Sequence, residues 1–305
     1  MRVRIFALFL TLSSPALAAD LLDVLPPSAR VRGVPGSMSI QPRECRTVPV
    51  ADARARIVGV ALQQWNFFGS RISDYTEVED DAGDPPPGPS TLLGAGPSTL
   101  LGAGDRPGRR PRLPPAEAAR VAPSIAGYWA VTPEGSWIVA RQNDRWNGED
   151  GIAARWNAPW SAAFISWVMC EGGLGTNAQF QRAVAHHSYI DQAIRARDGR
   201  APQAAFVAYD PGETTIGVGD LLCSSRRPAY RTIADRRRQM GVGARSHCDV
   251  VVKVDEAGQR VHAIGGNVRG VVSLKLFPAF RPAGKPLRVG SGDDDRPMFA
   301  HLKLR

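Results

Sequence analysis

The sequence predicts an α+β fold in which helices lie on one side of an antiparallel sheet. Three observations lead to this prediction. An apolar segment that begins at residue 161 has the spacing of a buried helix. A β-branched run at 250–254 has the composition of a central strand, and a second strand follows it at 261–264 after a short turn. This helix and hairpin also hold the residues that predict a catalytic site.

Residues 1–19 are typical of a secretory signal peptide. Arg2 and Arg4 precede a short apolar stretch, and a cleavage site of the Ala-x-Ala type ends at Ala18. No later apolar run approaches the roughly 18 residues that a membrane span requires. We therefore expect an exported mature chain, periplasmic or extracellular, with no transmembrane segment.

The mature chain is expected to begin with a leader, one helix and an insertion. Residues 20–49 contain proline and glycine without periodicity, which predicts an extended leader. Residues 50–79 hold the N-terminal helix of the core, because apolar side chains recur at helical spacing between residues 51 and 69. Residues 80–115 contain Gly-Pro-Ser-Thr-Leu-Leu-Gly-Ala at 88–95 and again at 96–103, beside proline-rich sequence. This composition predicts a disordered insertion, to which we assign no function.

The remaining residues, 116–305, are expected to form a single catalytic-type domain. Residues 116–120 predict the start of a short helix or a linker, and 128–131 and 137–140 predict short strands or loops. Residues 177–197 predict a second long helix, which places His186 and Tyr189 near the cleft in supporting positions. An alternative is that His186 lies at the surface or at the edge of the core. Strands at 274–277 and 299–304 close the sheet.

The helix after Pro159 carries the candidate nucleophile. Proline disfavours helical backbone for the residue before it, so the helix starts only after Pro159. The first helical side chain, Ser161, then lies where backbone N–H groups and the positive end of the helix dipole converge. That setting stabilises a developing oxyanion. The simpler alternative is that Ser161 only caps the helix.

The predicted hairpin supplies a histidine and its partner. Side chains alternate along a strand, so His247 and Asp249 share one face and Cys248 lies on the other. Asn267 follows Gly265-Gly266 on the return strand, and the glycines let the backbone bend so that Asn267 reaches His247. Together with Ser161 these residues have the composition of a nucleophile, a base and an orienting group.

These three segments resemble the motifs of the CHAP amidohydrolase/peptidase families, which share the papain-like fold. Those families carry Pro-Trp-Cys-Ala-Ala-Phe, a Gly-His strand and Gly-Gly-Asn. This chain has Pro-Trp-Ser-Ala-Ala-Phe at 159–164, so by position Ser161 matches the cysteine, His247 the histidine and Asn267 the third residue. The resemblance implies a papain-like fold and cleavage of amide bonds in peptidoglycan. The serine is a departure from the pattern, and it places that activity in question.

A wider resemblance extends from roughly Ile57 to the C-terminus. Over this length the chain is similar to a bacterial family of secreted and envelope proteins whose domain has no assigned function. The similar segments include Arg-Trp-Asn at 155–157 and the run Ala-His-His-Ser-Tyr-Ile at 185–190.

Three functional hypotheses follow. The first is an exported cell-envelope hydrolase of amide or ester bonds, directed at peptidoglycan, in which Ser161 attacks, His247 is the base and Asn267 orients the imidazole. Asp249 is an alternative orienter. The second is a catalytically inactive CHAP-like pseudoenzyme that binds cell-wall fragments or a partner protein. The third is an esterase or transferase acting on envelope lipid or glycan. Trp160 would form a wall of the cleft, unless it only fills the core.

Composition limits the partners. The formal net charge is +9, and it falls to +7, which is 36 basic minus 29 acidic residues, once Arg2 and Arg4 leave with the signal peptide. Nearly all of the positive charge is arginine, and such an excess of arginine over lysine often reflects the base composition of a genome. We therefore expect no nucleic-acid partner, although anionic envelope surfaces would attract the chain. The spacing of cysteine and histidine predicts no metal site, and we expect no cofactor. The substrate is therefore expected to be a cell-wall peptide or glycan.

The chain has four cysteines, which in an exported protein suggest up to two disulfides and allow three pairings. Cys223 and Cys248 lie in or beside strands that are expected to be neighbours, so they are the first pair to expect. Cys248 points away from His247 and Cys170 lies at the far end of its helix. Neither is therefore a good nucleophile candidate.

Overall fold

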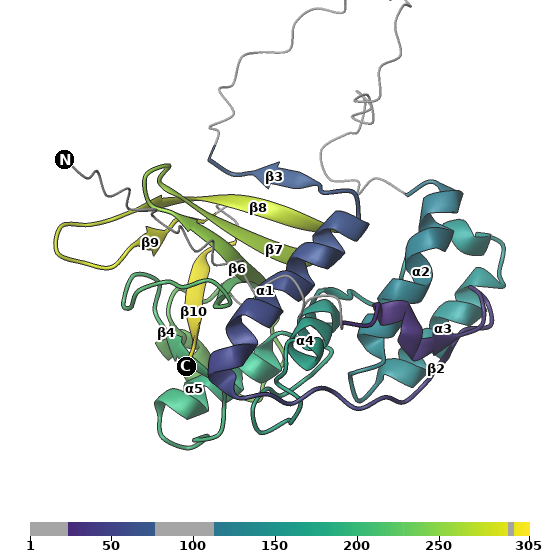
Figure 1. Ribbon diagram of the computed structural model, residues 1–305, viewed down its shortest axis with the longest axis horizontal. Helices are drawn as coiled ribbons and strands as arrows, with labels where there is room; N and C mark the ends of the chain where they lie inside the picture. Colours follow the sequence, from purple (N-terminus) through teal and green to yellow (C-terminus); the bar gives the residue numbers. More distant parts are fainter. Residues whose placement is uncertain (1–23, 77–112, 228, 292–295) are drawn as a thin grey trace, which may run out of the picture.

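The computed structural model describes residues 24–76, 113–227, 229–291 and 296–305. Within them, the chain forms a large sheet and a two-stranded hairpin (Figure 1). The hairpin strands are β1 (Val31–Arg32) and β2 (Ser39–Ile40). The strands of the large sheet are β3 (Ile72–Asp74), β4 (Phe206–Tyr209), β5 (Leu221–Arg227), β6 (Arg245–Asp255), β7 (Arg260–Val268), β8 (Val271–Phe280), β9 (Arg288–Val289) and β10 (Met298–Leu304).

The strand order of the large sheet is β3-β8-β7-β6-β5-β10-β4, and β9 pairs with β8. All of these pairs are antiparallel except β3 with β8, which run parallel at one edge. The predicted α+β class is therefore confirmed, with a sheet that is mixed at one edge. The predicted hairpin is β6 and β7, and the closing strands are β8 and β10.

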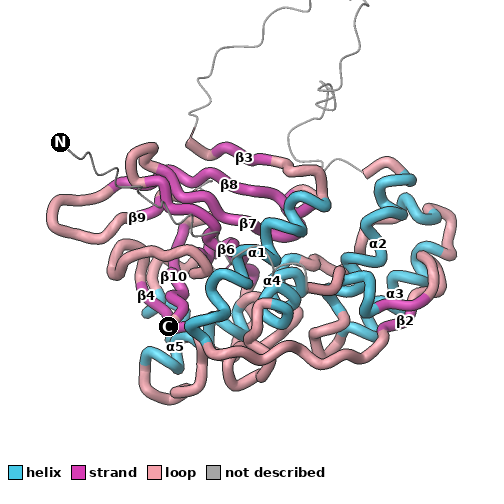
Figure 2. Tube along the Cα trace, in the orientation of Figure 1, coloured by secondary structure: helices cyan, strands magenta, loops and turns pink. Residues whose placement is uncertain are grey.

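Helices pack against this sheet and against one another (Figure 2). They are α1 (Val50–Phe67), α2 (Pro115–Trp129), α3 (Gly135–Trp146), α4 (Ser161–Glu171), α5 (His187–Arg197) and α6 (Ile233–Arg237), with short 3₁₀ turns η2 (Pro27–Arg30) and η3 (Gly151–Ala153). Helices α1, α4 and α5 contact the sheet directly, whereas α2 packs on α4 and α3 packs on α2.

The two faces of the sheet differ in how much apolar surface covers them. Val250 and Ile264 point into the main core together with the buried side chains of α1, α4 and α5. Their neighbours Val251 and Ala263 point to the opposite face, into a smaller cluster with Phe277. Alternation along β6 and β7 thus divides the core into two layers. The helices lie on the face with the larger layer, as predicted.

Two disulfides join distant parts of the chain. Cys223 and Cys248 are directly opposed on β5 and β6 and form one of them, so the first expected pair is confirmed. Cys45 pairs with Cys170 at the end of α4. No free cysteine remains, which leaves neither Cys170 nor Cys248 available as a nucleophile.

The described part of the leader, residues 24–49, is tied to the helical side of the molecule. Besides the Cys45–Cys170 bond, the Arg30 guanidinium donates to Glu171 Oε1 at 2.7 Å. Turn η2 packs so closely on α2 that a Cβ on Gly127 would lie 2.0 Å from the Pro27 carbonyl oxygen. The expected signal peptide at 1–19 and the insertion up to residue 112 lie outside the described residues.

Three predicted elements differ from the structure. The segments at 128–131 and 137–140, expected to be strands or loops, lie in or next to α2 and in α3. Pro123 lies inside α2, although a proline within a helix usually interrupts it. The helix expected at 177–197 begins only at His187. Before it, residues 177–186 form an irregular segment whose backbone is bonded by side chains from elsewhere, as described below.

Candidate active site

Ser161 is the first residue of α4, and its hydroxyl faces a histidine. Trp160 is the N-cap residue, and the helix from Ala162 to Cys170 is completely buried, whereas Ser161 is only partly buried. The Ser161 Oγ lies 2.7 Å from His186 Nε2. The Ser161 side chain therefore does not cap the helix, and the alternative prediction that Ser161 serves only as a cap is wrong. The first N–H groups of α4 have no partner within the helix, as at any helix N-terminus.

His186 is held in place by an irregular segment. The Gln192 side chain accepts a hydrogen bond from Gln181 N at 2.7 Å and donates to the carbonyl oxygens of Asn177 and Ala178. Ser166 Oγ, on α4, donates to the Ala183 carbonyl at 3.1 Å. These bonds replace the helical ones that the sequence predicted, and they bring His186 to the start of α4.

The other nitrogen of His186 contacts Tyr189. The Tyr189 hydroxyl hydrogen-bonds His186 Nδ1, and both side chains are buried. Burial raises the pKa of the Tyr189 phenol well above its ordinary value, with a smaller contribution from Asp249. Burial also lowers the pKa of His186 well below 6.5, and nearby His247 adds to this effect. Both groups are therefore neutral at neutral pH.

A second histidine lies beside the first and has a charged partner. His247 Nε2 lies 2.9 Å from Asp249 Oδ1, which confirms that the two side chains share one face of β6. Lys275 Nζ, on β8, donates to Asp249 Oδ2 at 3.0 Å. The ring centroids of His247 and His186 are 5.2 Å apart. Ser161, both imidazoles and the Asp249–Lys275 pair thus form one continuous cluster.

The charges in this cluster fix the protonation of Asp249 and His247. Burial acts to raise the Asp249 pKa, but the Lys275 ammonium and the hydrogen bond with His247 outweigh it, so the pKa lies far below its ordinary value. The pKa of His247 is lowered by burial and then by Lys275, against the opposing effect of Asp249. At neutral pH, Asp249 is a carboxylate and His247 is neutral. Because a carboxylate only accepts, His247 carries its proton on Nε2 and leaves Nδ1 as a free base.

Hydrogen-bond satisfaction indicates the opposite role for His186. Tyr189 is only 1% exposed, and the described residues offer its hydroxyl no partner other than His186. A buried hydroxyl that cannot donate costs about 1–3 kcal/mol. The favoured arrangement therefore has Tyr189 donating to Nδ1, which places the His186 proton on Nε2, where it is donated to Ser161 Oγ. In this tautomer His186 cannot accept the serine proton.

No hydrogen bond joins Asn267 to His247 in the part of the chain that the structure describes. Asn267 has a positive φ of 58° at the end of β7, where the pairing with β8 shifts register between Gly265 and Val268. Within the described residues its side chain makes no hydrogen bond, and the position expected for it beside His247 Nε2 is taken by Asp249. The geometry thus favours Asp249, the alternative orienter, over Asn267.

The glycines before Asn267 are required by close packing. A Cβ on Gly265 would lie 1.9 Å from Asp249 Oδ1 and 2.8 Å from His247 Nε2. A Cβ on Gly266 would lie 2.6 Å from the Cβ of Phe164 on α4. These contacts hold β7 against both the His247–Asp249 pair and the nucleophile helix, which was not apparent from the sequence.

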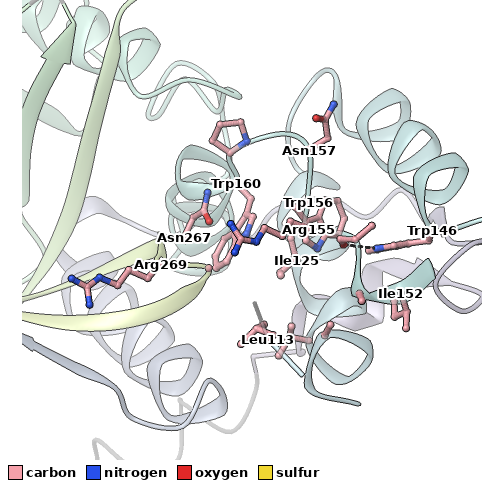
Figure 3. A pocket seen from close by; sticks show the side chains of 16 residues that line it. Leu113, Ile125, Trp146, Ile152, Arg155, Trp156, Asn157, Trp160, Asn267 and Arg269 are labelled. Atoms are coloured by element: carbon pink, nitrogen blue, oxygen red, sulfur yellow. Dashed lines mark hydrogen bonds between the residues drawn. The ribbon is translucent and has the colours of Figure 1, made fainter. Parts of the chain in front are cut away.

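Trp160 is almost completely buried, at 2% exposure, and its ring stacks with those of Phe68 and Tyr128. It also lines a pocket, as does Asn267 (Figure 3). Trp160 therefore fills the core, and its role as a wall of the catalytic cleft stays a prediction. No group of three or more His, Cys, Asp or Glu side chains that could hold a metal ion occurs in the part of the chain that the structure describes.

Comparison with known protein families adds one finding. Residues 121–304 match a family model described as an uncharacterized protein conserved in bacteria (DUF2272). The chain belongs to this family. The DUF2272 match includes the whole cluster from Ser161 to Lys275, and it begins later than the resemblance expected from near Ile57. No curated protein and no solved structure matches the chain. Among the described helices, none is both long and apolar enough to cross a bilayer.

Proposed function

We propose that this DUF2272 protein is an exported hydrolase of amide or ester bonds in the cell envelope, with Ser161 as the nucleophile. One observation carries the proposal: the Ser161 hydroxyl, at the start of a buried helix, hydrogen-bonds one neutral imidazole while a second imidazole beside it is paired with a buried carboxylate. Nucleophile, base and orienting group in this order are the parts of a serine hydrolase.

In the proposed reaction, His247 is the general base. Because Ser161 Oγ accepts its hydrogen bond from His186, its own proton is available to be directed toward the free Nδ1 of His247. Oγ attacks the substrate carbonyl carbon while Nδ1 takes the proton, and Asp249 stabilises the resulting imidazolium. The proton then passes to the leaving amine or alcohol. Attack by water on the acyl-enzyme, again with His247 as base, releases the acid and restores Ser161.

His186 has a different part in this proposal. Its Nε2–H holds Ser161 Oγ in the ground state and stabilises the negative charge that develops on that oxygen as the proton leaves. Tyr189 keeps His186 in the donating tautomer. The unpaired N–H groups at the start of α4 are oriented to receive the oxyanion of the tetrahedral intermediate.

Three points support an envelope substrate. The sequence motifs resemble those of CHAP enzymes, which would imply a papain-like arrangement and peptidoglycan as substrate. The two disulfides are typical of proteins in oxidising compartments outside the cytoplasm. The net charge of +7, which is 36 basic minus 29 acidic residues after removal of the expected signal peptide, favours approach to anionic envelope surfaces.

Assays of the mature protein on peptidoglycan and on simple esters, together with labelling by a fluorophosphonate probe, test this function. We expect turnover that Ser161→Ala lowers by about a thousandfold or more, and labelling confined to Ser161. Full turnover in Ser161→Ala would exclude the serine mechanism. Activity that appears only in Ser161→Cys, with no labelling of the natural protein, would show instead a disarmed relative that binds wall fragments or a partner.

A further inference from the structure

A pocket adjoins the candidate active site on the side of α2 and α3. About 750 Å³ of empty space lies within it, including the part open to solvent. Trp160 forms a wall of it, and Ser161 is the next residue along the chain. Figure 3 shows the side chains around it, which come from α2, the η3 region and the turn between β7 and β8.

The interior and the rim of this pocket differ in chemistry. Val121, Ile125 and Trp146 are buried apolar side chains that contribute to its interior, and Leu113 and Ile152 add partly buried apolar surface. The polar lining residues are more exposed: Arg155, Asn157 and Arg269 are exposed, and Asn267 is partly buried. The pocket is therefore apolar within and more polar at its mouth, where Arg155 contributes positive charge, whereas the Arg269 side chain extends away from the pocket (Figure 3).

The pocket is also connected to the reacting groups through the backbone. Trp160 is the N-cap of the helix that Ser161 begins. On the other side, Asn267 follows the two glycines that pack on Asp249, His247 and Phe164. Two lining residues of the pocket, Trp160 and Asn267, therefore lie directly beside the segments that hold the reacting groups, and one substituent of the substrate carbonyl is taken to enter the pocket past Trp160.

We infer that this pocket receives an apolar acyl chain, so that the preferred substrates are esters or amides of medium- or long-chain acids. The inference rests on the proposed function and specifies its substrate. Burial of methylene groups favours such chains over short polar peptides, which would leave the apolar interior unfilled. Ser161 takes the acyl group, the alcohol or amine leaves with the proton from His247, and water then releases the acid.

Binding can be tested without turnover. Ser161→Ala protein is titrated with a dansyl-labelled undecanoic acid and followed by fluorescence. Ala118→Phe, which fills the pocket from α2, should weaken binding by about tenfold or more. Ala116→Phe is the matched control, because Ala116 lies on the same helix, is exposed and does not line the pocket. Equal affinity in the two Phe variants, or no binding at all, would overturn the inference.

Turnover provides the second arm. With p-nitrophenyl acetate, butyrate and octanoate, kcat/KM should rise by about threefold or more per pair of added methylenes. Ala118→Phe should abolish this rise, whereas the control Ala116→Phe should retain it. A flat chain-length profile with normal Ser161-dependent turnover would overturn the acyl pocket alone. Absence of turnover on every substrate, together with Ala118-dependent binding of the dansyl acid, would refute the proposed hydrolase and leave the acyl-binding pocket standing.

Discussion

His186 and His247 are both neutral imidazoles near Ser161, but different partners hold them. His186 is bonded by a neutral phenol, that of Tyr189, whereas His247 is bonded by a buried carboxylate, that of Asp249. A phenol can donate its proton and a carboxylate can only accept one. The first partner therefore directs a proton toward the serine, and the second leaves a lone pair free to take a proton from it.

This difference shows why distance alone does not identify a base. Ser161 Oγ lies 2.7 Å from His186, which makes His186 the obvious candidate. The partner on the far nitrogen decides which tautomer is present, and the tautomer decides the direction in which the proton moves. On this reasoning the nearer histidine is a donor and its neighbour, paired with Asp249, is the base.

The largest change is expected when the carboxylate loses its charge. Asp249→Asn presents an amide that can donate to His247 Nε2 and so favours the wrong tautomer, with the proton on Nδ1. We expect kcat to fall by about a thousandfold or more, since the equivalent change in a serine triad costs about 10⁴. The measurement is steady-state turnover on whichever substrate the natural protein cleaves.

A control is needed because Lys275 is itself buried, at 7% exposure, and would lose its ionic partner. Removing one member of a buried pair costs about 3–5 kcal/mol of folding free energy. The double variant Asp249→Asn, Lys275→Met removes both charges and should recover thermal stability without recovering activity. If the double variant regained turnover, the loss in the single variant would be a folding defect and Asp249 would not orient His247.

A smaller effect on kcat/KM is expected when the pH is lowered. His247 must be unprotonated to act as base, so kcat/KM should be constant at neutral pH and fall by about tenfold per pH unit at lower pH. Because the His247 pKa is lowered from 6.5, the midpoint of this fall should lie below that value. Lys275→Met removes a charge that lowers the pKa, so it should move the midpoint to higher pH. A midpoint that does not move would indicate that another group titrates.

Local signals in the sequence were sufficient for the helix and the hairpin that carry the site. Pro159 and the apolar run after it predicted α4, and the β-branched run after Asp249 predicted β6. Alternation along β6 placed His247 beside Asp249, and the pairing of Cys223 with Cys248 followed from neighbouring strands. Each of these features depends on contacts between residues that are close in sequence or on strict strand periodicity.

The contact between Ser161 and His186 depends on long-range bonds and could not be predicted in the same way. It needs residues 177–186 to leave the helical conformation, and Gln192 and Ser166 supply the bonds that make this favourable. Apolar residues at helical spacing in this segment gave the opposite indication. The prediction for Asn267 rested on the bend that Gly265-Gly266 allows, whereas the register shift between β7 and β8 beside it depends on pairing that the local sequence does not indicate.

The most direct test of the central claim is the rate at which a fluorophosphonate labels Ser161 in two matched variants, His247→Gln and His186→Gln. Glutamine can donate a hydrogen bond but cannot act as a base. It can therefore supply the hydrogen bond proposed for His186, but it cannot take the serine proton as proposed for His247. We predict that His247→Gln slows labelling by about a thousandfold or more and that His186→Gln slows it by about tenfold or less. The reverse order, with the larger loss in His186→Gln, would contradict the assignment of His247 as the base.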